Sequence, residues 1–311
     1  MRTMRHLYCL ALLCLTAGFP ALLANGPGVQ IELQGRIPRE VDQGKITIRK
    51  AAALDLDFAG NLYIIDRGRH QLLKFSPAGE LIDQVGGFGQ SAEQFDDPRD
   101  VDAHTTLDVF VADYNNNRVV RFDKNLNFLN ALASQWPDPY NFQQVISLAV
   151  SSQYDLFLLE ESAKRIIKFS RFSEPTASFG GIYETFGQLL EPVQMCIDGS
   201  QRLFVSDPAQ SAVVVFDYLG NFVSNLSHPD LNAPAGMCWG EDQHLYVVNR
   251  GTAEIFVFSK TLAFRGLISL KNYVDEIVDV GLQQEQNQPS KRLYALTRNG
   301  CLVFRVTETP K

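Results

Sequence analysis

Six short apolar segments of this sequence each end in a polar residue whose side chain can bind a metal ion or transfer a proton. These residues are Asp66, Asp113, Glu160, Asp207, Asn249 and Thr297. Successive copies lie 47, 47, 47, 42 and 48 residues apart. A residue that recurs once per structural unit lies far from its copies, and a short acceptor at a strand end hydrogen-bonds the backbone of its own turn. We therefore interpret this set as structural rather than catalytic.

The position after each of these residues varies, and this variation indicates a binding site. Arginine occupies it in units one, five and six, which are consecutive when the units form a closed ring. Arginine side chains bind carboxylate and phosphate groups through paired hydrogen bonds. We predict a site for an anionic group or an acidic partner segment at Arg67, Arg69, Arg99, Tyr114, Asn116, Arg250 and Arg298. The alternative is that these arginines are merely solvated at turns.

Metal-binding and nucleophilic motifs are weak in this sequence. Four histidines follow the first 24 residues, His70, His104, His228 and His244, and they have no ligand spacing. Cys196 and Cys238 each follow a methionine and occupy equivalent positions in adjacent units, whereas Cys301 has no such counterpart. We interpret the three thiols as packed in the core, although a disulfide or a soft-metal pair at Cys196 and Cys238 stays open. We predict no catalytic residue, no metal site and no cofactor.

Regular spacing also identifies the elements that position these residues. Each polar residue closes a five-residue apolar segment with an aromatic second residue, and such segments are typical of buried strands. These segments are 62–66, 109–113, 156–160, 203–207, 245–249 and 293–297. A second apolar segment ends at a phenylalanine nine residues later in the first five units and seven residues later in the sixth.

A four-stranded unit of 42–48 residues repeated six times predicts an all-β fold, a six-bladed β-propeller of antiparallel blades. Two stacked β-sandwiches would not keep one 47-residue spacing over three consecutive units. The sixth unit has strands near Glu276–Leu282, at Leu293–Thr297 and at Cys301–Val306, and then the chain ends. Its fourth strand must come from the N-terminal segment 25–50, from Val29–Ile37 or from Gly44–Arg49. The propeller then spans residues 51–311.

Residues 1–24 have the pattern of an export signal peptide, with Arg2 and Arg5 before a nine-residue apolar run and small residues after it. Cleavage after Ala24 or after Gly18 fits this pattern. Removing residues 1–24 changes the formal net charge from −7 to −9, because the segment holds two arginines and no acid. We expect an exported protein, periplasmic or extracellular, with no transmembrane segment in the mature chain. A charge of this sign disfavours nucleic-acid binding.

The segment from Asp113 to Phe122 meets the pattern Asp-x-x-x-Asn-Arg-Val-x-x-Phe in full, and the segment from Glu160 to Phe169 meets it in part. The glycine-rich linker from Gly86 to Pro98 ends in Phe-x-x-Pro. In these features the chain resembles the NHL repeat family over roughly Ala51–Val306, although units four to six keep only the spacing.

The resemblance implies an interaction platform, because many propellers of this family bind partners. We expect a non-catalytic, monomeric propeller that recognises a protein, peptide or glycan on the face formed by its linkers and by the turns after the polar residues. The alternative is a propeller hydrolase or lyase, similar to lactonases or amidating lyases, that uses the central channel.

Overall fold

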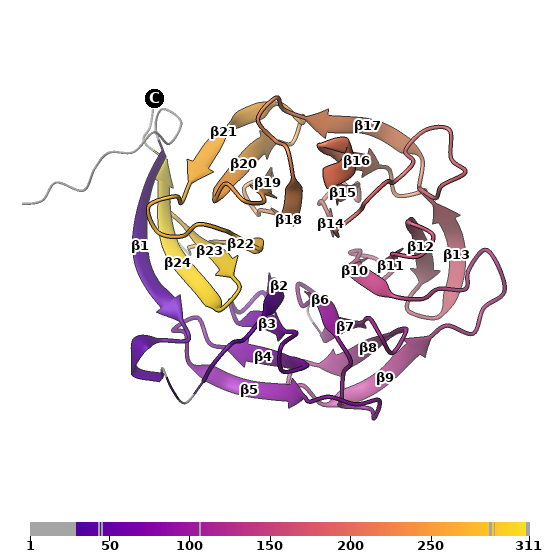
Figure 1. The fold of residues 1–311 in the computed structure, drawn as a ribbon, viewed down its shortest axis with the longest axis horizontal. Coiled ribbons are helices and arrows are strands. Elements are labelled where there is room, and N and C mark those ends of the chain that lie inside the picture. Colours follow the sequence, from indigo (N-terminus) through magenta and orange to yellow (C-terminus); the bar gives the residue numbers. More distant parts are fainter. Residues whose placement is uncertain are drawn as a thin grey trace, which may run out of the picture.

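Six four-stranded sheets surround a central axis in the computed structural model of the chain (Figure 1). The structure describes residues 29–308, except 43, 45, 106, 286, 287 and 289. The predicted six-bladed β-propeller is confirmed. The export signal predicted for residues 1–24 lies outside the described residues.

Each blade consists of four antiparallel strands, listed here from the axis outward. Blades 1 to 3 are β2 (Ala51–Leu56), β3 (Leu62–Asp66), β4 (Gln71–Phe75), β5 (Leu81–Gly86); β6 (Pro98–Asp102), β7 (Asp108–Asp113), β8 (Arg118–Asp123), β9 (Phe128–Ala133); β10 (Val145–Val150), β11 (Leu156–Glu160), β12 (Arg165–Ser170), β13 (Glu174–Phe179). Blades 4 to 6 are β14 (Gln194–Ile197), β15 (Leu203–Asp207), β16 (Ala212–Phe216), β17 (Phe222–Ser227); β18 (Pro234–Trp239), β19 (His244–Asn249), β20 (Glu254–Ser259), β21 (Phe264–Ser269); β22 (Asp279–Gln284), β23 (Lys291–Thr297), β24 (Gly300–Glu308), β1 (Val29–Ile37). Two short 3₁₀ turns cover Glu40–Asp42 and Pro208–Gln210.

The core lies between neighbouring blades. Every residue of β3, β7, β11 and β15 is buried, because both faces of each sheet pack against another sheet. Tyr63 and Ile65 of blade 1, for example, belong to one cluster with Val109 and Val111 of blade 2. Alternation along a strand sends successive side chains to opposite faces, so a strand of apolar residues supplies two such clusters. The six sheets therefore bury their apolar surface only as a closed ring.

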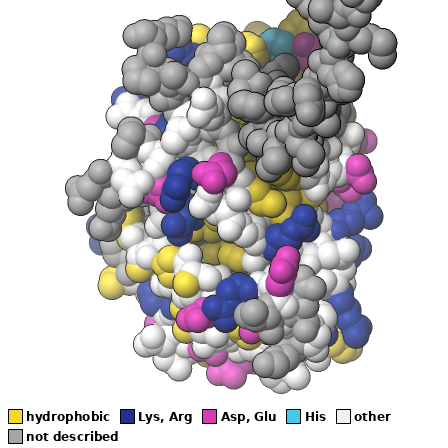
Figure 2. Space-filling model, turned by 90° about the vertical axis from the view of Figure 1, so that its left-hand side faces the viewer, with side chains coloured by type: hydrophobic (Ala, Val, Ile, Leu, Met, Phe, Trp, Pro, Cys, Tyr) yellow, Lys and Arg dark blue, Asp and Glu magenta, His cyan; other side chains and the backbone are white. Residues whose placement is uncertain are grey.

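Strand β1 closes this ring from the N-terminal side. It pairs antiparallel with β24, from Val29 opposite Glu308 to Ile37 opposite Cys301. Of the two candidate segments, Val29–Ile37 supplies the fourth strand, and the chain then crosses to blade 1 (Figure 1). The first strand of blade 6 begins at Asp279, a few residues later than the predicted start. Figure 2 shows the side of the ring on which β1 lies, where basic and acidic side chains lie next to each other around hydrophobic ones.

The polar residues that end the second strands hold the chain that leads into the same blade. Asp66 accepts hydrogen bonds from the backbone N–H groups of Arg49 and Lys50, which lie 17 and 16 positions before it. Asp207 and Asn249 repeat this contact at the same two separations, on 190/191 and 232/233. The structural interpretation of this set is thus confirmed for these blades: each acceptor fixes a linker.

Among the described residues, no helix has the length and the hydropathy that crossing a bilayer requires. The three cysteines within the described residues, Cys196, Cys238 and Cys301, are free thiols.

Candidate functional site

Four exposed or half-exposed basic side chains gather where blade 6 meets blade 1, and we call them the basic patch: Arg49, Lys50, Arg69 and Arg298. They lie on the loop face, which carries the blade linkers and the turns between second and third strands. The Ala51 N–H donates to the carbonyl of Arg298, which brings the chain at Lys50 beside blade 6. A Cβ added at Gly68 would lie 2.7 Å from the Cβ of Arg49, so Arg49 lies against the turn that carries Arg69.

The patch retains a net positive charge. Arg298 pairs with Glu276 at 3.0 Å, and its side chain is 71% exposed. Arg69 donates to the hydroxyl of Thr47, a neutral partner. Arg49 and Lys50 have no side-chain partner among the described residues. One carboxylate therefore pairs with the four basic side chains, and a second, the buried Asp66, accepts from the backbone N–H groups of Arg49 and Lys50, which leaves an excess of positive charge.

Two of the predicted arginines hold a carboxylate of the chain itself. Arg67 donates from Nε and Nη2 to the two oxygens of Asp97 at 2.6 and 2.7 Å. Arg99 donates from Nε to Asp97 Oδ2 at 2.9 Å, and its guanidinium lies 4.0 Å from the ring centroid of Tyr114. The Tyr114 hydroxyl donates to Glu161, so this contact series joins blades 1, 2 and 3. Burial raises the pKa of Asp97, but the hydrogen bonds and charges of Arg67 and Arg99 outweigh burial and hold that pKa below its usual value.

The structure separates the remaining predicted residues from this contact series. Asn116 donates to the carbonyl of Gly89 and to Asp113, so it fixes the linker between blades 1 and 2. Arg250 is exposed on blade 5, next to blade 6 in the ring, and has no side-chain partner among the described residues. The seven predicted residues therefore share the loop face without forming one site.

A cavity of about 640 Å³ occupies the central channel and opens on the opposite face, between the turns that join first and second strands. Carboxylates outnumber basic groups in its lining: Asp55, Asp57, Asp100, Asp102, Asp198 and Glu241 stand against His104 and Lys260. This cavity is distinct from the basic patch in both position and charge.

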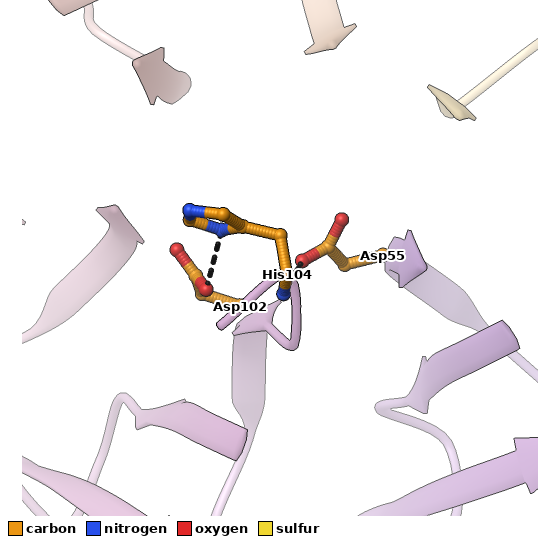
Figure 3. Close-up of side chains that lie close together, drawn as sticks. All are labelled: Asp55, Asp102 and His104. Atoms are coloured by element: carbon orange, nitrogen blue, oxygen red, sulfur yellow. Dashed lines mark hydrogen bonds and ion pairs between the residues drawn. The ribbon is translucent and has the colours of Figure 1, made fainter. Parts of the chain in front are cut away.

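Three of these residues form a compact cluster at the cavity wall (Figure 3). Asp55 lies on β2, Asp102 ends β6, and His104 follows two residues later. His104 Nδ1 lies 2.8 Å from Asp102 Oδ1 in an ion pair. Burial lowers the pKa of His104, but the two carboxylates outweigh burial and raise it to about 9. Burial and the neighbouring Asp102 raise the pKa of Asp55 to about 6.

A layer of polar side chains on the inner strands lies deeper in the channel, towards the loop face. Asp100 accepts a 2.5 Å hydrogen bond from the Ser147 hydroxyl, and Ser147 accepts from the backbone of Met195. Gln194 donates to Asp279 at 3.0 Å, and Asp279 accepts from the Leu54 N–H. These bonds join blade to blade around the axis. Burial raises the pKa of Asp100 to about 7 and that of Asp279 well above its usual value.

Cys196 and Cys238 line the same cavity from neighbouring inner strands. Both are only half-buried against the channel, whereas Cys301 is buried in the core. Burial raises the pKa of each of the two channel thiols, so both stay protonated at neutral pH.

The sequence analysis did not select Arg49 and Lys50, because they precede the repeats. It did not select Asp55, Asp102 and His104, because it searched for histidines at metal-ligand spacing and His104 has no second histidine near it in the sequence. A signal was present for the cluster. Asp55 and Asp102 are 47 residues apart, the repeat length, and so are Asp57 and His104. Equivalent positions on adjacent inner strands converge on the axis of a propeller.

Residues 95–122 match the NHL repeat family model. The chain carries an NHL repeat. Within this repeat Arg118 donates from Nε to Asp113 Oδ2 at 2.7 Å. A comparison with curated proteins found no match.

Solved structures with the same fold include two lyases. One is a streptogramin B lyase, with a TM-score of 0.60 and 10% identity over 91% of this chain and 98% of that chain. The other is virginiamycin B lyase from Staphylococcus aureus, with a TM-score of 0.59 and 10% identity over 90% of this chain and 99% of that chain. At this identity the likeness concerns the fold alone.

Proposed function

We propose that this protein is a binding propeller whose loop face docks an acidic segment of a partner protein at the basic patch. The observation that carries the proposal is the gathering of Arg49, Lys50, Arg69 and Arg298 on a chain whose formal net charge is −7. Guanidinium groups bind carboxylates in a bidentate manner, and a local positive field on an acidic protein selects and steers acidic partners.

An exposed aromatic side chain in the next linker of the loop face supports a protein partner over a small anion. Phe88, in the linker between blades 1 and 2, is 70% exposed. Its ring lies 5.2 Å from that of His70, the residue after Arg69. Aromatic and arginine side chains together are the types enriched at the centres of protein interfaces. The predicted export signal indicates a periplasmic or extracellular partner.

The test measures binding of a fluorescein-labelled peptide rich in Glu and Asp by fluorescence anisotropy. The patch variant carries Arg49→Gln, Lys50→Gln, Arg69→Gln and Arg298→Gln. The matched control carries Arg36→Gln, Arg171→Gln, Arg265→Gln and Lys260→Gln, which are also exposed and remove the same charge. We expect about tenfold or weaker binding in the patch variant alone, and binding by the wild type that falls with added salt. Equal affinity of the two variants would refute the proposal.

A second candidate function is a hydrolase or lyase that uses the central channel. It is supported by the Asp102–His104 pair, since a histidine held by a buried carboxylate is the usual form of a general acid or base. Turnover of a lactone or of a streptogramin B by the wild type, with loss in His104→Gln, would support this candidate. No turnover by the wild type would contradict this candidate, and equal turnover in both proteins would exclude His104 from the reaction.

A further inference from the structure

The cluster in the central cavity combines three ligand types that metal ions use. The ligand atoms of Asp55, Asp102 and His104 all lie within 4.8 Å of one another. Asp55 and Asp102 lie on β2 and β6, adjacent inner strands of the ring, so sheet packing sets the spacing of these two carboxylates. His104 lies in the turn that follows β6. Ligand atoms around one ion lie about 3 to 4 Å apart. The three side chains therefore need to move closer together, by about 1 Å, for a single ion to contact all of them.

One carboxylate oxygen of this cluster has the His104 ring as its one close partner among the described residues. Asp102 is 5% exposed, and its Oδ2 accepts from the Val150 N–H at 2.8 Å. Its buried Oδ1 forms an ion pair with His104 Nδ1 at 2.8 Å and has no further hydrogen-bond donor. A metal ion can replace the proton of such a pair, because carboxylate and neutral imidazole are both metal ligands.

The lysine beside the cluster is held by a backbone carbonyl. Lys124 donates to the carbonyl of Ala103 at 2.5 Å, and no direct ion pair joins it to Asp55 or Asp102 within the described ranges. Its charge still acts on both carboxylates, but His104 is the basic group in direct contact with Asp102. The site is reachable, because the His104 side chain is 43% exposed and lines the open cavity of about 640 Å³.

We propose that Asp55, Asp102 and His104 bind a divalent transition-metal ion, Zn²⁺ in preference to Mn²⁺ or Ca²⁺. One imidazole and two carboxylates are nitrogen and oxygen ligands, a mixed set that suits Zn²⁺ and, by the general affinity order, binds it more tightly than Mn²⁺. Three protein ligands leave a coordination position directed into the cavity. The proposal is independent of the basic patch, which lies on the other face.

The test titrates metal-free protein with Zn²⁺ by isothermal titration calorimetry. We expect one Zn²⁺ per chain in the wild type and at least tenfold weaker binding in Asp102→Asn and in His104→Gln. Two control variants should bind as the wild type does: Glu241→Gln, an exposed acid in the same cavity, and His244→Gln, a histidine 3.2 Å from Asp242 that lacks a second carboxylate.

Circular dichroism of each variant separates loss of binding from loss of fold, and this control matters for Asp102, whose Oδ2 also holds blade 3. Co²⁺ supplies a second readout: a visible absorption band of the wild-type complex should be lost in His104→Gln. Absence of saturable Zn²⁺ binding, or equal binding by a folded His104→Gln variant, would overturn the proposal.

Discussion

Replacing Arg118 by alanine tests the ion pair at the centre of the NHL repeat. The Arg118 side chain is 13% exposed, and its partner Asp113 is 0% exposed. The same guanidinium donates to the backbone carbonyls of Gln90, Ser91 and Gln94, at 3.1, 2.8 and 2.7 Å. One side chain therefore both balances a buried carboxylate and fixes the linker between blades 1 and 2.

The expected cost is set by the carboxylate that the variant leaves unbalanced. Removing one partner of a buried ion pair costs about 3–5 kcal/mol. Asp113 would keep hydrogen bonds from the Asp96 N–H and from Asn116, both at 2.8 Å, and water can replace Arg118 at the exposed carbonyls. We therefore expect the lower end, a loss of about 3 kcal/mol in the free energy of unfolding. For a domain of this size such a loss corresponds to roughly 6–12 °C in Tm.

The assay is urea unfolding monitored by circular dichroism, with Arg265→Ala as the control. Arg265 is an exposed arginine on the outer strand β21, and removing it should change the free energy of unfolding by about 0.5 kcal/mol or less. If Arg118→Ala costs no more than Arg265→Ala, the pair does not hold the linker and the reasoning is wrong.

Three further predictions concern the ring. Asp97→Asn should cost about 1–2 kcal/mol at pH 7, because it removes a carboxylate held by two guanidiniums. Since the folded-state pKa of Asp97 is lowered, this difference between wild type and variant should shrink as the pH falls below the ordinary carboxyl pKa and should be lost as it falls through the folded-state pKa; unfolding at pH 7 and at a series of acidic pH values checks this. Phe122→Ala removes a fully buried ring from the cluster between blades 1 and 2, and should cost about 3–5 kcal/mol in urea unfolding, against about 0.5 kcal/mol for exposed Leu219→Ala. Deleting residues 29–37 exposes the edge of β24, and size-exclusion chromatography should show association of the deleted form; a stable monomer would contradict the closure argument.

Much of the fold was predictable because burial between sheets imposes a pattern on every blade. A strand such as β3 is covered on both faces, so it is apolar up to the acceptor that ends it, and that acceptor holds the linker that leads into the same blade. Both requirements recur at the repeat length and are visible without coordinates. The origin of the closing strand followed from counting, since blade 6 had three strands.

The site was less predictable because it depends on which charges meet across blades. Arg67 and Arg99 were correctly placed on the loop face, but Asp97 turns between them through a left-handed backbone conformation, φ 56°, which the sequence does not reveal. Arg49 lies at a linker position that recurs in other blades, but the residue type differs there: its counterparts are Leu190 and Asn232. His104 joins Asp102 only because the inner strand ends at that point and the next turn bends back into the channel.

The central claim is that an acidic partner segment docks at the basic patch, and zero-length carbodiimide cross-linking tests it most directly. The reagent joins a peptide carboxylate to a lysine amine in contact with it, and peptide mapping by mass spectrometry locates the bond. With the Glu- and Asp-rich peptide, we predict cross-links at Lys50, reduced by added salt and absent for the peptide with Gln and Asn in place of the acids. Cross-links concentrated at Lys124 or Lys260, on the opposite face, with none at Lys50, would contradict the account.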